Sequence, residues 1–243
     1  MIVLIITAVR VKSMDSHRIS GRILAENIAG PGMLRLVEQS MQARARKTSV
    51  TEIAVKERKH PQAALTFDDG PDIRYTPLLL DGLKERNVRA SFFLLGEKVE
   101  QYPELVERMQ KEGHLVGNHT YHHVQLNKLN ETKAREEILK TNNLIYETTG
   151  VYPLYLRPPF GAWKKNLELC VEMLPVFWTI DTLDWKVQNT EKIVHTVQEQ
   201  IEDGAIILMH DEYDTSVEAA LQVVDELKNQ GYELVTVDQL ILP

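Results

Sequence analysis

The stretch A-A-L-T-F-D-D-G-P, residues 63–71, combines an apolar run with two acidic residues and a turn. Residues 63–67 are typical of a buried β-strand, and Asp68 and Asp69 follow at its carboxyl end. By itself the acidic pair is equally typical of an ordinary turn. Adjacent side chains point apart, however, so one carboxylate can bind a metal ion while the other accepts a proton. We therefore predict that Asp69 is a metal ligand and that Asp68 is a general base.

A second string, N-H-T-Y-H-H at residues 118–123, lies about fifty residues further on. His119 and His123 are four residues apart, so a helix or helical turn would place both on one face. Two imidazoles and one carboxylate are the ligand set of a catalytic zinc site that keeps one position open. Such histidine pairs also occur without metal, and the complementary Asp69 is what favours the metal site.

The pattern from residue 61 onward alternates between strands and helices, which is typical of a parallel sheet covered by helices. About seven strand–helix units predict a barrel or a strongly curved sheet rather than an open doubly wound sheet. No glycine-rich phosphate loop follows any strand, so nothing indicates nucleotide binding. Strands are expected at residues 63–67, 88–95, 115–117, 154–157, 176–180, 205–209 and 233–237; helices are expected at 76–86, 103–112, 131–149, 166–173, 190–201 and 216–230.

Reactive residues recur at the predicted strand ends, which in barrels form the rim where active sites are built. Arg157 begins the run R-P-P-F-G. It is either a structural ion-pair partner or the group that orients Asp68 and keeps it ionised. In the second case the Phe160 N–H would face the substrate as an oxyanion donor.

The last two strand ends add an aromatic residue and a further acid. Trp185, in D-T-L-D-W, is either a core residue or a contact for a sugar or acyl group. His210 ends a very apolar strand, and we expect it to protonate a leaving group, with Asp184 raising its pKa.

Composition separates the first 60 residues from the rest. Residues 1–60 carry 11 Lys+Arg against 5 Asp+Glu, a balance of +6, whereas the remainder balances at −13. The acidic part is a poor candidate for nucleic-acid binding. We predict a basic arm at residues 1–60, which is either a solvated leader or a segment that contacts an anionic cell wall or membrane, and a catalytic domain at residues 61–243.

Neither the N-terminus nor the single cysteine fixes the cellular compartment. Residues 1–9 are apolar, but a spanning helix needs roughly 20 residues, and the positive charges follow the stretch rather than precede it. The segment is therefore either part of an anchor or signal, or an element packed on the domain. Cys170 is the only cysteine, which excludes an intrachain disulfide and a cysteine-based zinc site.

Taken in order, five motifs resemble those of the polysaccharide deacetylases of carbohydrate esterase family 4, the NodB-homology domain. They are T-F-D-D-G-P (66–71), H-T-x-x-H (119–123), R-P-P-F-G (157–161), D-x-x-D-W (181–185) and L-x-H (208–210). The resemblance covers residues 61–243, and the combination is far more specific than any one motif. The closing segment, residues 213–240, is most similar to bacterial peptidoglycan N-acetylglucosamine deacetylases.

The resemblance implies an α/β fold, a distorted (β/α) barrel of about seven strands, and one divalent metal ion, zinc or cobalt. It implies Asp69, His119 and His123 as ligands, Asp68 as base paired with Arg157, and His210 as acid paired with Asp184. Substrate would contact Phe160, where the family commonly has Tyr, together with Trp185 and Leu208 in an acetyl pocket. Tyr121, between the two histidines, is a further candidate for substrate binding.

The implied activity is hydrolysis of N-acetyl groups on N-acetylglucosamine units of a polysaccharide, peptidoglycan or chitooligosaccharide, with release of acetate. An enzyme acting on peptidoglycan must work outside the membrane, so we expect an extracytoplasmic location. Two alternatives stay open at this point: an O-acetyl xylan esterase on the same fold, and a catalytically inactive carbohydrate-binding module.

Overall fold

The structure is a computed structural model that describes residues 59–163 and 173–241. The predicted arm (up to residue 58), the apolar residues 1–9, Cys170 and nearly all of the helix predicted at residues 166–173 lie outside these ranges. The arm and the domain boundary near residue 60 therefore remain predictions.

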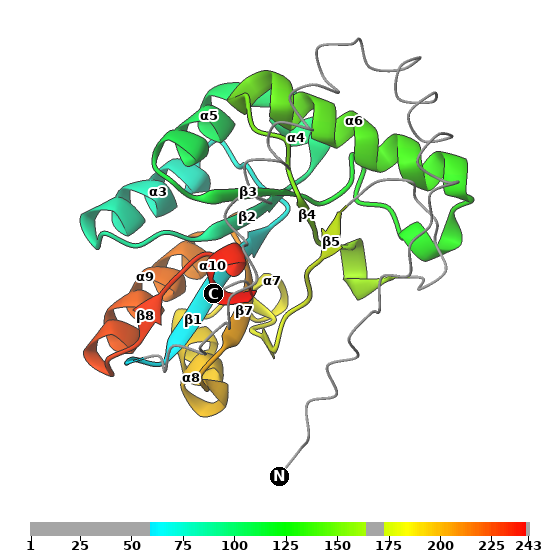
Figure 1. Cartoon of the computed structure of the whole chain (residues 1–243). Coiled ribbons are helices and arrows are strands. Elements are labelled where there is room, and N and C mark those ends of the chain that lie inside the picture. Colours follow the sequence, from blue (N-terminus) through cyan, green and yellow to red (C-terminus); the bar gives the residue numbers. More distant parts are fainter. Residues whose placement is uncertain (1–58, 164–172, 242–243) are drawn as a thin grey trace, which may run out of the picture. The chain divides into compact units, whose positions relative to one another are not determined.

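A single parallel sheet organises the described residues (Figure 1). Its strand order is β5-β4-β3-β2-β1-β7-β6, with β8 paired to the start of β1 on the edge opposite β7. The prediction of a distorted (β/α) barrel of about seven strands is confirmed: seven parallel strands curl into a half-barrel, and β8 adds a short eighth. The strands are β1 (Gln62–Asp68), β2 (Ser91–Leu94), β3 (Leu115–Asn118), β4 (Tyr155–Leu156), β5 (Leu174–Pro175), β6 (Ile180–Asp181), β7 (Ala205–His210) and β8 (Glu233–Leu234).

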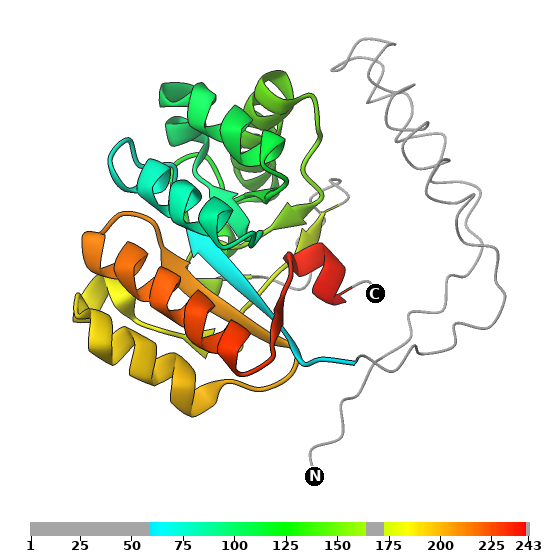
Figure 2. The ribbon, with the colours of Figure 1, turned by 90° about the vertical axis from the view of Figure 1, so that its left-hand side faces the viewer.

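Helices alternate with these strands, and α3 and α9 lie side by side on one face of the sheet (Figure 2). Their apolar sides pack on the sheet: Leu79, Leu80 and Leu83 of α3 are fully buried. The helices are α3 (Tyr75–Glu85), α4 (Gly96–Gln101), α5 (Pro103–Lys111), α6 (Glu131–Thr149), α7 (Asp184–Val187), α8 (Thr190–Gln200), α9 (Asp214–Asn229) and α10 (Val237–Ile241), with 3-10 turns η1 (Leu126–Lys128) and η2 (Pro159–Gly161).

Strand β1 lies in the interior because both of its faces are covered. Leu65 and Phe67 belong to the largest hydrophobic cluster, and Ala64 belongs to a second cluster on the opposite face. Burial on both faces explains why this strand reads as a continuous apolar run rather than an alternating one. It also carries the carboxylate of Asp68, at the end of the strand, into a buried position (3% exposed).

Two predicted strands differ from the structure, and several short helices were not predicted. The strand expected at 176–180 is replaced by the two-residue strands β5 and β6. The strand expected at 233–237 ends at Leu234 and is followed by α10, and helices α4 and α7 were not predicted. These pieces have two to six residues, which is too short for hydrophobic periodicity to identify them. No described helix has the length and apolar composition needed to cross a membrane.

Candidate active site

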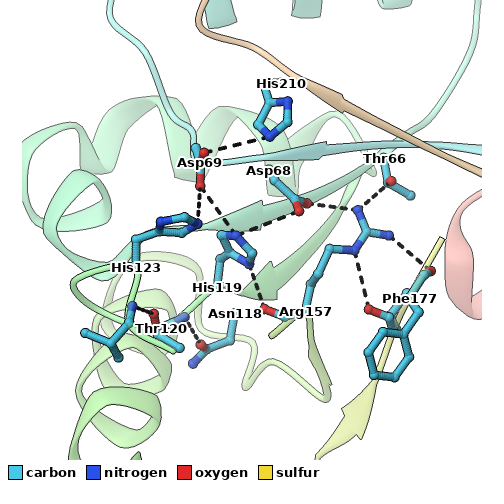
Figure 3. A network of polar contacts seen from close by, with 12 residues as sticks. Thr66, Asp68, Asp69, Asn118, His119, Thr120, His123, Arg157, Phe177 and His210 are labelled. Carbon is cyan, nitrogen blue, oxygen red and sulfur yellow. Dashed lines mark hydrogen bonds and ion pairs between the residues drawn. The ribbon is translucent and has the colours of Figure 1, made fainter. Parts of the chain in front are cut away.

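Two adjacent strands bring the acidic pair and His210 together. Asp68 and His210 are the last residues of β1 and β7, and they are register partners across the parallel pair. Asp69 follows Asp68 in a left-handed conformation (φ 70°), and an oxygen of each carboxylate lies within 4 Å of His119 Nε2. Figure 3 shows both carboxylates facing the histidines, with His210 on the far side of Asp69.

The histidine pair converges on Asp69, but not on a helix. Strand β3 ends at Asn118, and residues 119–123 form a loop in which Thr120 (φ 67°) and His123 (φ 54°) are left-handed. The helical turn expected from the four-residue spacing is therefore wrong, although the rings still come together. The Nε2 atoms of His119 and His123 each lie 3.4 Å from Asp69 Oδ1. One ligand atom from each residue lies within 4.8 Å of the others.

The protonation state of these residues also suits a divalent cation. His119 Nδ1 lies 2.6 Å from the Arg157 carbonyl oxygen, which can only accept, so Nδ1 carries the proton and Nε2 keeps its lone pair. Burial lowers the pKa of His119 to about 3 against the opposing charge of Asp69, so the ring is neutral at pH 7. Asp69 Oδ1 is buried without a hydrogen-bond partner in the described structure. A cation would satisfy this oxygen, and the three residues therefore fit a metal.

Arg157 is fully buried beside Asp68. Its Nη1 donates to Asp68 Oδ1 (2.9 Å) and to Thr66 Oγ1 (2.6 Å). Burial raises the pKa of Asp68 above its ordinary value, even though the charge of Arg157 lowers it. Arg157 was expected to keep Asp68 ionised; it opposes protonation, but burial is the larger effect. A carboxylate with a raised pKa is a stronger proton acceptor than an exposed one.

His210 is held by Asp184 from the start of α7. Asp184 accepts from the His210 N–H (2.7 Å) and lies 2.8 Å from His210 Nδ1. Burial alone would lower the pKa of His210, but the hydrogen bond and charge of Asp184, with smaller contributions from Asp68 and Asp69, raise it to about 9. His210 Nε2 lies 3.8 Å from Asp69 Oδ2 and therefore faces the same space as the proposed ligands.

The four residues expected to contact substrate are placed differently from one another. Phe160 is left-handed (φ 59°) and exposed, and its ring centroid lies 4.5 Å from that of His123. Trp185 is half exposed and Leu208 is buried. Tyr121 is 8% exposed, and its hydroxyl donates to Glu100 on α4, which does not favour a substrate contact.

Two supporting residues had no assigned role in the sequence prediction. Thr66 joins the strands, because its hydroxyl accepts from Arg157 and donates to the Ile207 carbonyl (2.7 Å). The Asn118 side chain accepts from the Thr120 N–H (2.7 Å) and donates into α6. Both lie inside the quoted motifs, next to predicted site residues, and that adjacency is the one signal that could have identified them.

The chain matches the family model described as polysaccharide deacetylase over residues 55–178. It is 42% identical over 185 residues to the peptidoglycan-N-acetylglucosamine deacetylase PgdA of Listeria monocytogenes. This alignment covers 76% of this chain and 40% of the relative. The chain thus spans well under half of that relative's length.

Two solved structures show how far the likeness extends. The peptidoglycan deacetylase PdaC from Bacillus subtilis has a TM-score of 0.73 and 42% identity, covering 75% of this chain and 91% of the other. The Xyl-CE4 domain of a multidomain xylanase from the hindgut metagenome of Trinervitermes trinervoides has a TM-score of 0.70 and 31% identity, covering 75% of this chain and 90% of the other. Family model, sequence identity and fold agree, and the chain belongs to the polysaccharide deacetylase family.

Proposed function

We propose that this chain is a metal-dependent deacetylase that removes N-acetyl groups from N-acetylglucosamine units of peptidoglycan and releases acetate. The observation that carries the proposal is the meeting of a ligand set with a separate acid and base. Asp69, His119 and His123 converge, while Asp68 and His210 remain available beside them. The names of the Listeria and Bacillus relatives support peptidoglycan as the substrate.

Asp69, His119 and His123 would hold the metal. A divalent cation bound there supplies positive charge that polarises a carbonyl oxygen and makes a water molecule more acidic. Zinc suits two imidazoles and a carboxylate, and cobalt is the alternative within the family. Every other step is performed by the chain's own residues.

Asp68 accepts the proton of the attacking water, whose oxygen forms a bond to the acetyl carbon. The buried Arg157 keeps the acceptor oxygen oriented through its 2.9 Å hydrogen bond. The Phe160 N–H is proposed to donate to the developing oxyanion. His210 gives its proton to the glucosamine nitrogen as the carbon–nitrogen bond breaks, because an amine does not leave as an anion. Acetate and a free amine result.

The test of the substrate is acetate release from peptidoglycan, N-acetylglucosamine oligomers and acetylated xylan, with free amines measured in parallel. The proposal predicts acetate and an equal amount of new amine from the first two. Release from acetylated xylan alone would replace it with an O-acetyl esterase, a candidate that the likeness to the xylanase-associated domain favours. Saturable glycan binding without acetate would indicate an inactive binding module.

The location follows from the proposed substrate, and the role of the basic arm follows from its charge. Peptidoglycan lies outside the membrane, so the enzyme would act there. We propose that residues 1–60, with their positive charge balance, contact anionic wall polymers or lipids. A chain lacking residues 1–60 should then bind cell walls less tightly, and the salt dependence of that binding should weaken. Unchanged wall binding would remove this role.

A further inference from the structure

The loop that carries both histidine ligands does not stabilise its own conformation. Residues 119–123 belong to no helix or strand, and the non-glycine residues Thr120 and His123 both have positive φ angles. L-residues are disfavoured in that region and persist there when surrounding structure holds them. The hydrogen bonds of the loop backbone show which elements do so.

Helix α4 fixes the loop from one side through the loop's carbonyl groups. The Gly96 N–H donates to the Thr120 carbonyl (2.9 Å), and the Glu97 N–H donates to the Tyr121 carbonyl (3.3 Å). A side chain at Gly96 would collide with Tyr121 and Thr141, so the helix can approach this closely because the residue is glycine. The His119 N–H donates to the Leu94 carbonyl and the Thr120 N–H donates to Asn118, which leaves the N–H groups of Tyr121 and His122 for another partner.

That partner is Glu137, in the middle of α6. Its Oε2 accepts from the N–H groups of Tyr121 (3.1 Å) and His122 (2.9 Å), and its Oε1 lies 2.7 Å from His122 Nδ1. The side chain is 16% exposed. A largely buried carboxylate that accepts two backbone N–H groups makes strong, charge-assisted hydrogen bonds. The same helix accepts from Asn118 through the Ile138 carbonyl and the Asn142 side chain.

We propose that Glu137 is a positioning residue for the metal centre: it holds the His119–His123 loop in its ligating conformation before the metal binds. The inference rests on the metal centre of the proposed function but not on the identity of the substrate. Glu137 contacts neither the ligand atoms nor the acid and base in the described structure, so its effect on them passes through the loop backbone.

The test measures cobalt affinity of the metal-stripped full-length protein by the visible absorption of bound Co²⁺. Glu137→Ala removes both acceptors and is expected to weaken cobalt binding by about 10–100-fold, the usual effect of losing a partner behind a ligand. Glu137→Gln keeps one oxygen for the two N–H groups and should restore most of the affinity. Glu136→Ala is the matched control, because Glu136 is an exposed neighbour on the same helix.

A second measurement needs no variant. Hydrogen exchange of the metal-free wild-type protein should show slow exchange at the Tyr121 and His122 amides. Fast exchange there would overturn the inference even if Glu137→Ala did not fold.

The outcomes separate this inference from the proposed function. If the cobalt affinity of Glu137→Ala is within twofold of the wild-type affinity, the positioning role is overturned and the metal centre stands. Glu137→Gln as weak as Glu137→Ala would also contradict it, because the two N–H bonds would not be what matters. Wild-type protein that binds no cobalt would overturn the metal centre and the inference together.

Discussion

Replacing Arg157 with methionine tests the buried ion pair at the centre of the site. Arg157 is 0% exposed and Asp68 is 3% exposed, and the two are joined by the 2.9 Å bond from Nη1 to Oδ1. Methionine fills part of the space but leaves the carboxylate buried without its cation. Removing one member of a buried pair costs about 3–5 kcal/mol of unfolding free energy. For a domain of this size that is about 6–20 °C in Tm.

The double variant Arg157→Met/Asp68→Asn separates the charge from the packing. With both charges removed, the remaining loss is that of neutral hydrogen bonds, about 1–2 kcal/mol. The double variant should therefore be more stable than Arg157→Met alone. The loss in the single variant should also shrink from pH 7 to pH 5, because the uncompensated Asp68 can take up a proton in the folded state.

Urea unfolding of metal-free protein, followed by circular dichroism with chelator present, measures all three quantities. Chelation matters because bound metal would add its own stabilisation. The reasoning is refuted if Arg157→Met lies within about 1 kcal/mol of wild type. It is refuted equally if the double variant is as unstable as the single one, since the buried charge would then not be the cause.

Three further predictions concern the acid, the base and one buried carboxyl. Asp68→Asn should lower acetate release by about 10²–10⁴-fold while metal content, measured by elemental analysis, stays at the wild-type level; near-wild-type activity would exclude Asp68 as base. Asp184→Asn should lower the pKa of His210, so the alkaline limb of the kcat profile should move down by about 1–3 pH units, and an unmoved limb would argue against this pair. Burial raises the pKa of Asp211 to about 7, despite a hydrogen bond from Thr76. The protonated Asp211 therefore contributes stability that is fully present below its unfolded pKa near 4 and is lost as the pH rises through 7. Asp211→Asn should remove this pH dependence, so that the unfolding free energy of the metal-free variant falls by up to about 4 kcal/mol less between pH 4 and pH 7 than that of the wild type. An unchanged slope would contradict this.

Where sequence and structure agree, the local signal was strong. The apolar run of β1 gives way to Asp68 as expected, because a strand covered on both faces is apolar along most of its buried length. Helix α6 was predicted with its observed bounds. Asn130 accepts from the Lys133 N–H at its start, and Gly150 ends it at φ 71°.

Where they differ, the cause lies in contacts distant along the chain. The His119–His123 spacing suggested a helix, but the loop is fixed by α4 and by Glu137, which no local pattern reveals. Tyr121 was a candidate for substrate binding, and the local sequence did not reveal that its hydroxyl donates to Glu100 on α4. Strand ends predicted which residues meet, because parallel strands share one rim. They did not predict which backbone groups hold them there.

The most direct test of the central claim is acetate release from N-acetylglucosamine oligomers by metal-stripped protein as zinc or cobalt is added back. The account predicts no release from the stripped protein and full recovery at about one equivalent of metal per chain. Asp69→Ala should show no such recovery. Full activity in the stripped protein, or recovery of Asp69→Ala at the wild-type metal concentration, would contradict a metal centre built from Asp69, His119 and His123.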